Sequence, residues 1–165
     1  MLMGADVLMQ KARPVEDPCA CEIKALAGDM WDTMAEEGGI GIAAPQVGVS
    51  LRMICFGRED VPGVPRTVLI NPEIEVIGAE TQDGWEGCLS LPGLTGRVER
   101  AEHICYRGLD LEGRVIERRA SGLHARVVQH EFDHLEGILY PMRITGWRNF
   151  GFTEALFPQA PGGEE

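Results

Sequence analysis

The five residues His130-Glu131-Phe132-Asp133-His134 restrict the fold of this chain more than any other segment. Residues four apart lie on the same face of an α-helix, so His130 and His134 can bind one metal ion if the segment is helical. Glu131 follows the first histidine directly and can act there as a general base. The motif therefore predicts a helix that carries a hydrolytic metal site.

The length of the chain, 165 residues, suits one domain with a sizeable core. Its apolar fraction of 44% and charged fraction of 25% are ordinary for a globular protein. The last eight residues, 158–165, are rich in Pro, Gly and Glu. We expect a single catalytic domain over residues 1–157, followed by a flexible tail over 158–165.

The charge of the chain limits the partners that it can bind. A net charge of −11 argues against nucleic acids, which need a basic surface, and disfavours anionic membranes. A run of 18 apolar residues is absent, as is a basic N-terminal segment followed by an apolar core, so neither a membrane span nor a signal peptide is expected.

The chain has five cysteines, an odd number at irregular spacing, which is a poor disulfide framework. This favours a reducing compartment, and we expect a cytoplasmic protein. Cys19 and Cys21 could form half of a metal site, but no His or Cys follows nearby, so we interpret them as loop cysteines. Cys55 lies in the apolar run Met53–Phe56 and is expected to pack in the core.

Two segments have the periodicity of helices. Apolar residues recur at helical spacing between Glu22 and Glu37, and Gly38-Gly39 ends that pattern. A second helix is predicted from Gly122 to Glu136, with Ser121 as N-cap and Gly137 after its end.

Short β-rich runs separated by Gly and Pro fill the middle of the chain, at 51–56, 67–70, 73–77, 97–106 and 109–116. Tight turns are predicted at 107–110 and 112–113, so adjacent strands there should be antiparallel. These patterns predict an α+β fold, in which antiparallel β-sheets pack around a central helix that carries the histidines.

Two further segments could complete the metal site. Cys88 is flanked by glycines and followed by Pro92, a setting that can aim a thiolate and present the Leu89 backbone N–H to a substrate oxygen. As a third ligand it would leave one coordination position open. The alternative is a buried cysteine in a turn.

Gln46 lies in the second of these segments, among the small and apolar residues 39–48. Its side-chain amide could donate to a developing oxyanion, although the segment alone also fits a Gly/Ala turn with a surface glutamine. It is not a dinucleotide fingerprint, because it follows a helix and lacks the third glycine.

Together the three segments resemble the peptide deformylase family. The resemblance rests on Gly39-Ile-Gly-Ile-Ala-Ala-Pro-Gln46, Glu86-Gly-Cys-Leu-Ser90 and Gln129-His-Glu-Phe-Asp-His-Leu-Glu-Gly137, in family order, and extends over residues 8–144. It implies that a metal is bound by Cys88, His130 and His134. It further implies Glu131 as the general acid and base, Gln46 and the Leu89 N–H as oxyanion donors, and a substrate-binding set of Gly41, Ile40, Glu86, Leu123 and Val127.

The resemblance also implies the reaction. A metal-dependent hydrolase of this kind removes the N-formyl group from formyl-methionyl nascent peptides and releases formate. The implied metal is Fe²⁺, with Zn²⁺ or Ni²⁺ as substitutes, and one thiolate with two imidazoles would accept any of them. The implied setting is the cytoplasm, with the ribosome near its exit tunnel as a further partner.

Two alternatives for the function, one departure from the family pattern and one open question about an ion pair remain at this stage. The alternatives are an H-E-x-x-H metallopeptidase, which would need a third ligand downstream of His134, and a catalytically silent deformylase-like binding protein. Residues after Ile144 do not have the pattern of the long C-terminal helix of many family members. Glu86 and Arg100 could form an ion pair, but the pattern favours Arg100 as a charge at a strand edge.

Overall fold

The structure is a computed structural model that describes residues 1–158. Its helices are α1 (Cys21–Glu36), α2 (Gly122–Leu135) and the short α3 (Thr153–Leu156). The strands are β1 (Gly41–Ala43), β2 (Met53–Phe56), β3 (Thr67–Val76), β4 (Thr81–Gly87), β5 (Leu94–Ala101), β6 (His103–Leu109), β7 (Val115–Ser121) and β8 (Phe150–Phe152). Short 3₁₀ helices are η1 (Asp6–Met9), η2 (Ala44–Val47), η3 (Tyr140–Arg143) and η4 (Trp147–Asn149).

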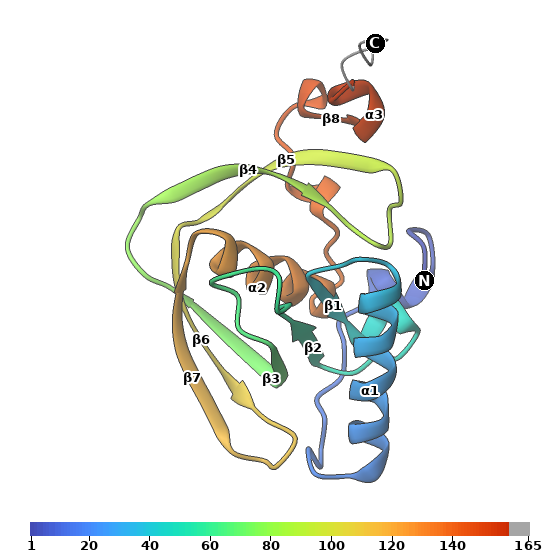
Figure 1. Ribbon diagram of the computed structural model, residues 1–165, viewed down its shortest axis with the longest axis vertical. Coiled ribbons are helices and arrows are strands. Elements are labelled where there is room, and N and C mark those ends of the chain that lie inside the picture. Colours follow the sequence, from blue (N-terminus) through green and yellow to red (C-terminus); the bar gives the residue numbers. More distant parts are fainter. Residues whose placement is uncertain (159–165) are drawn as a thin grey trace, which may run out of the picture.

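The strands form two antiparallel sheets. One has five strands in the order β1-β2-β3-β6-β7, and the other has three in the order β4-β5-β8. The sheets meet at a corner, where β3 leads into β4 and β5 leads into β6 (Figure 1). Backbone hydrogen bonds from Ile77 to His103 and from Glu102 to Glu80 hold this corner together.

The five-stranded sheet is buried on both faces at β2, where alternate residues point to opposite sides and all four are buried. In β2, Ile54 and Phe56 belong to the core beneath α2, whereas Met53 and Cys55 belong to the core beneath α1. The apolar stripe of α1 covers that second face through Ile23, Ala27, Met30 and Met34. The burial predicted for Cys55 is thus confirmed, at 0% exposure.

Helix α2 lies between the two sheets, with β4 and β5 arching over it (Figure 1). It packs Ala125, Val128 and Leu135 into the core of the five-stranded sheet. Arg126 and Asp133, on another side of the helix, bond to groups on β4 and β5. The predicted α+β fold around a histidine-bearing helix is confirmed.

The two long helices lie within one residue of their predicted bounds, and Ser121 occupies the N-cap position of α2, although no side-chain capping bond forms there. The strand predictions were less accurate. The segment 97–106, predicted as one strand, is divided at Glu102 between β5 and β6, which belong to different sheets. The segments 67–70 and 73–77 belong to one strand, β3, with an irregular register between Ile70 and Glu73.

The turn predicted at 107–110 was wrong, because Arg107 to Leu109 continue β6 in register with β7. The chain turns later, at Asp110 to Gly113, where the Asp110 side chain accepts two backbone N–H bonds. The turn at 112–113 is thereby confirmed. The strand predicted at 109–116 was wrong, because that segment contains the turn, and β7 was missed apart from its first two residues. Strands β1, β4 and β8 were not predicted either, since glycine-rich or very short segments give a weak alternation signal.

The end of the described chain contains η4, β8 and the four-residue α3, and no long C-terminal helix is present among residues 144–158. Most of the tail predicted for 158–165 lies outside the described residues, so the division of the chain at 157/158 stays a prediction. Within residues 1–158, no helix has the length and apolar character needed to cross a bilayer.

Leu69, which is 0% exposed on β3 beneath α2, provides a test of this packing. Leu69→Ala should lower the free energy of unfolding by about 2–5 kcal/mol, because it leaves a cavity in a close-packed core. Val76→Ala, at an exposed position of the same strand, should cost under about 1 kcal/mol. Urea titration would measure both, and equal losses would contradict this arrangement of β3.

Candidate active site

Three potential metal ligands converge between α2 and the end of β4. One ligand atom from each of Cys88, His130 and His134 lies within 4.8 Å of the others. Cys88 follows the last residue of β4, and its Sγ is 3.3 Å from His134 Nε2. The histidines are four residues apart on α2, as the motif requires. A soft thiolate with two imidazoles is a donor set that fits a divalent transition metal.

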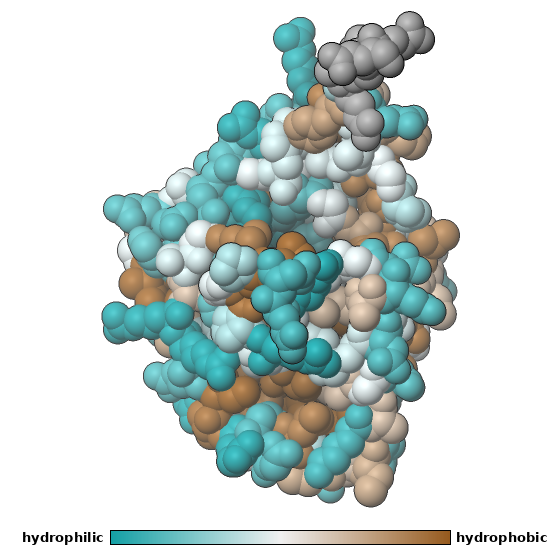
Figure 2. All heavy atoms as spheres, in the orientation of Figure 1, coloured by the Kyte–Doolittle hydropathy of each residue, from teal (hydrophilic) through white to brown (hydrophobic). Residues whose placement is uncertain are grey.

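A cleft of about 490 Å³ opens beside these ligands. The predicted site residues Gly41, Ile40, Gln46, Glu86, Cys88, Leu89, Leu123, Val127, His130 and Glu131 all line it, and His134 lies against the Cys88 thiol. Many hydrophilic side chains surround apolar ones on the face seen in Figure 2. A cleft of this volume is large enough for a small ligand beside the three potential metal ligands.

The carboxylate of Glu86 holds His130 in place. Glu86 Oε2 accepts a hydrogen bond from His130 Nδ1 at 2.8 Å, which leaves the other ring nitrogen for a metal. Arg100 donates to both carboxylate oxygens at 2.9 Å, and Arg126 donates to Oε1 at 2.8 Å. Burial alone would raise the pKa of Glu86, but the bonds from Arg100 and His130 hold it well below the usual value.

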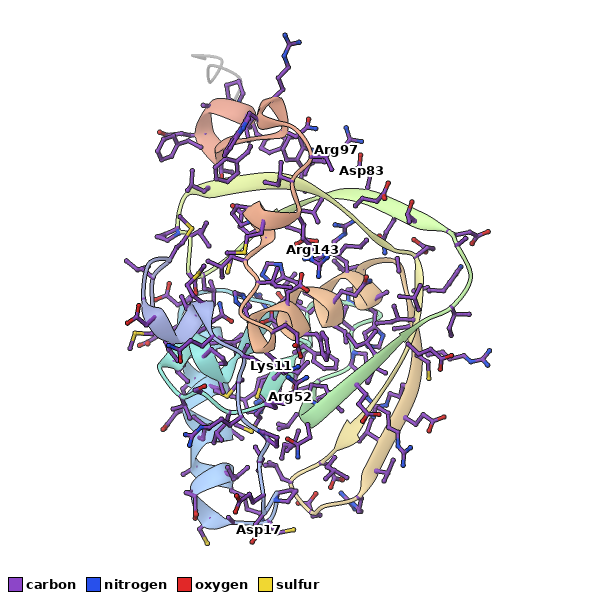
Figure 3. All side chains as sticks on the ribbon, turned by 180° about the vertical axis from the view of Figure 1, so that it is seen from behind. Lys11, Asp17, Arg52, Asp83, Arg97 and Arg143 are labelled. Carbon is purple, nitrogen blue, oxygen red and sulfur yellow. The ribbon has the colours of Figure 1, made fainter. Side chains whose placement is uncertain are left out.

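The interpretation of Arg100 as a strand-edge charge was wrong. Its side chain is 4% exposed, and besides Glu86 it bonds Asp133 of α2. Asp133 also accepts a fork of bonds from Arg143, which lies beside α2 in Figure 3. A guanidinium in this position therefore links β5 to the helix that carries the histidines.

Glu131 is buried in the wall of the cleft, at 4% exposure. Burial raises its pKa to about 7, and its Oε2 has no hydrogen-bond partner among the described residues. Gly41 lies so close that any side chain there would clash with the Glu131 carboxylate. A carboxyl group with a pKa near neutrality can both accept and return a proton.

Gln46 reaches the site from η2, where its Oε1 accepts the Ala43 backbone N–H at 2.8 Å. This bond turns the side-chain NH₂ toward the ligands, 3.5 Å from Cys88 Sγ and 3.2 Å from Ser90 Oγ. The side chain is buried, at 6% exposure. The alternative of a surface glutamine in a Gly/Ala turn is thus wrong, because Gln46 presents N–H donors beside the thiol.

The two histidines differ in charge preference. Burial alone would lower the pKa of His130, but bonds to Cys88 and Glu86 raise it to about 10. Burial and the neighbouring His130 lower the pKa of His134 well below its usual value. His134 therefore favours the neutral form that can bind a metal, and the anionic groups around His130 favour a positive charge at that position, which a metal ion would supply.

The predicted site set omitted several residues that line the cleft, among them Trp85, Arg126 and Thr153. Trp85 and Thr153 come from segments with no recognisable pattern, β4 and α3. Arg126 had a detectable signal, because Arg126, His130 and Asp133 fall at i, i+4 and i+7 on α2 and so share a face. A charged stripe on a helix buried between sheets indicates ionic partners.

The buried ion pairs can be tested against an exposed pair on the same strand. Arg100→Leu should lower the free energy of unfolding by about 3 kcal/mol, because Glu86 and Asp133 lose a charged partner without access to water. Arg97→Leu removes an exposed partner of Asp83 on the outer face of β5 (Figure 3) and should cost under about 1 kcal/mol. Chemical denaturation would measure both, and similar losses would contradict the role given to burial.

Comparison with known proteins places this geometry among described enzymes. The family model for polypeptide deformylase matches residues 1–149. Peptide deformylase 2 of Bordetella bronchiseptica is 54% identical over 163 residues, which cover 95% of this chain and 93% of that protein. Peptide deformylase 2 of Pseudomonas putida is 51% identical over 164 residues, with 94% and 92% covered.

Solved structures agree with these sequence matches. A peptide deformylase from Synechococcus elongatus, in complex with actinonin, superposes with a TM-score of 0.83 at 38% identity, covering 90% of this chain and 79% of that chain. A class I type b peptide deformylase from Acinetobacter baumannii gives a TM-score of 0.82 at 44% identity, with 87% and 95% covered.

Proposed function

Because the chain belongs to the peptide deformylase family, we propose that Cys88, His130 and His134 bind its catalytic metal ion and that Glu131 transfers the proton during hydrolysis. Enzymes of this family are metal-dependent and remove the N-formyl group from nascent peptides, and this chain is such an enzyme. The family match decides against the metallopeptidase, and relatives named as peptide deformylases support an active enzyme over the silent binding protein. The observation that carries the assignment of residues is the convergence of the three ligand atoms within 4.8 Å.

The metal ion, when bound, supplies Lewis acidity that polarises the formyl oxygen and makes water a better nucleophile. Glu131 takes the proton of the attacking water, since its pKa of about 7 allows it to accept a proton at neutral pH. It then returns this proton to the leaving amine. The products are formate and a peptide with a free N-terminus.

The oxyanion that forms during attack would be stabilised by two donors. Gln46 Nε2 lies 3.5 Å from Cys88 Sγ, and the Leu89 backbone N–H follows the same cysteine. Because Gln46 is held by its bond to Ala43, it needs little reorganisation as the charge develops.

The peptide would bind along the cleft. Gly41 is at the start of β1, the edge strand of the five-stranded sheet, where a substrate backbone can pair as an added strand. Ile40, Leu123, Val127 and the stem of Glu86 would form the pocket for the methionine side chain, since all of them line the cleft. A side chain at Gly39 would meet Leu89, and one at Gly41 would meet Glu131, so the backbone of this edge lies close to the site.

We further propose Fe²⁺ as the physiological metal, with Zn²⁺ or Ni²⁺ able to replace it, because the thiolate and imidazole donors suit all three. Because the substrate is the formyl-methionyl end of a nascent chain, we expect the enzyme to act in the cytoplasm, near the ribosomal exit tunnel. The five free cysteines are consistent with a reducing compartment. Metal analysis of protein purified without oxygen would test the choice of ion.

Glu131→Gln should lower kcat for a formyl-Met peptide by roughly 10²- to 10⁴-fold, because the amide has the shape of the carboxyl group but cannot accept the proton. Metal content should stay unchanged. Glu117→Gln, at an exposed position of β7, is the matched control and should retain full activity. Wild-type turnover in Glu131→Gln would contradict its role as the base.

Cys88→Ser should weaken metal binding by more than roughly 100-fold, beyond the range seen for residues that only support a ligand, because a hydroxyl is not ionised at neutral pH. Chelator competition with Ni²⁺ or Co²⁺ would measure the loss. Cys105→Ser, on β6, should bind metal like the wild type. Unchanged affinity in Cys88→Ser would remove Cys88 from the ligand set.

A further inference from the structure

Arg126 is a buried cation whose role the proposed chemistry does not explain. It lies on α2 one turn before His130, is 7% exposed and lines the cleft. A charged side chain this far from water needs strong partners to be tolerated. Its partners should therefore show what it does.

The guanidinium bonds to both strands of the cleft wall. Arg126 Nη1 donates to the Val98 carbonyl at 2.9 Å and to Glu86 Oε1 at 2.8 Å, while Nη2 donates to the Gln82 carbonyl at 2.9 Å. Val98 belongs to β5, and Gln82 and Glu86 belong to β4. One side chain thus joins the helix of the two histidines to the strand that leads into Cys88.

Gly84 makes this contact possible. A Cβ at Gly84 would lie 2.9 Å from Arg126 Cζ and Nη2, closer than real contacts allow. The flat guanidinium therefore lies directly against the backbone of β4. A lysine has no planar fork and could not bond to two strands and a carboxylate from one position.

Arg126 and Arg100 secure Glu86 from two sides. Arg100 approaches from β5 and also bonds Asp133, so the sheet and α2 stay linked without Arg126. Arg126 approaches from α2 itself, one turn before the ligand His130 that Glu86 orients. Loss of Arg126 should thus leave the fold in place and disturb the alignment of the ligands.

We propose that Arg126 is a positioning residue, which sets the distance between Cys88 and the two histidines and holds Glu86 against His130. This inference rests on the proposed metal ligands. Residues that support a ligand in this way typically contribute 10- to 100-fold to metal affinity.

The test uses Co²⁺, whose visible spectrum reports thiolate ligation and coordination geometry, together with chelator competition for Kd. Arg126→Met should raise the Kd for Co²⁺ by roughly 10- to 100-fold and change the spectrum, and Arg126→Lys should not restore either. Thermal unfolding of the metal-free variants reports stability separately. A lowered Tm with unchanged Kd and spectrum would mean that Arg126 is merely structural and would overturn the proposal.

Gly84→Ala provides a variant that keeps Arg126 but displaces it. It should weaken Co²⁺ binding in the wild type and have a smaller effect in Arg126→Met, because the added methyl group then has no guanidinium to displace. Gly28→Ala, on an exposed face of α1 with no atom near the added methyl group, is the matched control and should match the wild type. An equal effect of Gly84→Ala in both backgrounds would contradict the contact.

The same experiment distinguishes a failure of the proposed metal site from a failure of the role proposed for Arg126. If Cys88 is a ligand, wild-type protein shows a Co²⁺–thiolate absorption band that Cys88→Ser abolishes. Absence of that band in the wild type would overturn the metal site and this inference with it. A normal wild-type band that persists unchanged in Arg126→Met would overturn only the role of Arg126.

Discussion

The buried carboxylate of Glu86 is the group on which the geometry of the site depends. Its exposure is 6%, and an isolated charge at that depth would be strongly destabilising. Arg100, Arg126 and His130 offset this cost with bonds to both oxygens. Because these donors come from β5 and α2, the carboxylate can be satisfied only when strand and helix are correctly placed. The same condition places Cys88 beside the histidines.

Helix α2 serves the core and the site with different faces. Ala125, Val128 and Leu135 pack against the five-stranded sheet. Arg126, His130 and Asp133 form a second stripe, which bonds to groups on β4 and β5, while Glu131 lines the cleft and His134 lies beside the Cys88 thiol. The helix is buried on most of its surface, so its polar residues must pair with specific partners. That requirement makes the position of the metal ligands depend on packing at a distance from them.

The C-terminal segment differs from the long helix expected of many family members. The family match ends at residue 149, and the residues that follow form β8, which pairs with the edge of β5. The Thr153 hydroxyl lies 2.5 Å from that of Thr95, and both residues line the cleft. A short strand and one helical turn therefore extend the cleft wall, where a long helix would need a separate surface to pack on.

The local pattern of the chain determined α1 and α2 and indicated the residues that we propose as metal ligands. Helical periodicity and the spacing of His130 and His134 depend on residues close in sequence. Cys88 and Gln46 were related to the two histidines through the family resemblance, which rests on three motifs in order. The strand boundaries followed less well. The division at Glu102 has no Gly or Pro to mark it, because the corner arises from the meeting of two sheets.

Only the tertiary structure decided the burial of Arg100 and Arg126, the orientation of Gln46 and the pKa of Glu131. By alternation Arg100 shares the face of the buried Val98, but its charge favours an exposed position such as that of Arg97. The difference lies in which face of β5 meets α2, and that is set by contacts between segments far apart in the chain. The burial and pKa of a charged side chain depend on all the segments that pack around it. Helices and the spacing of metal-binding residues depend on only a few residues that are close in sequence.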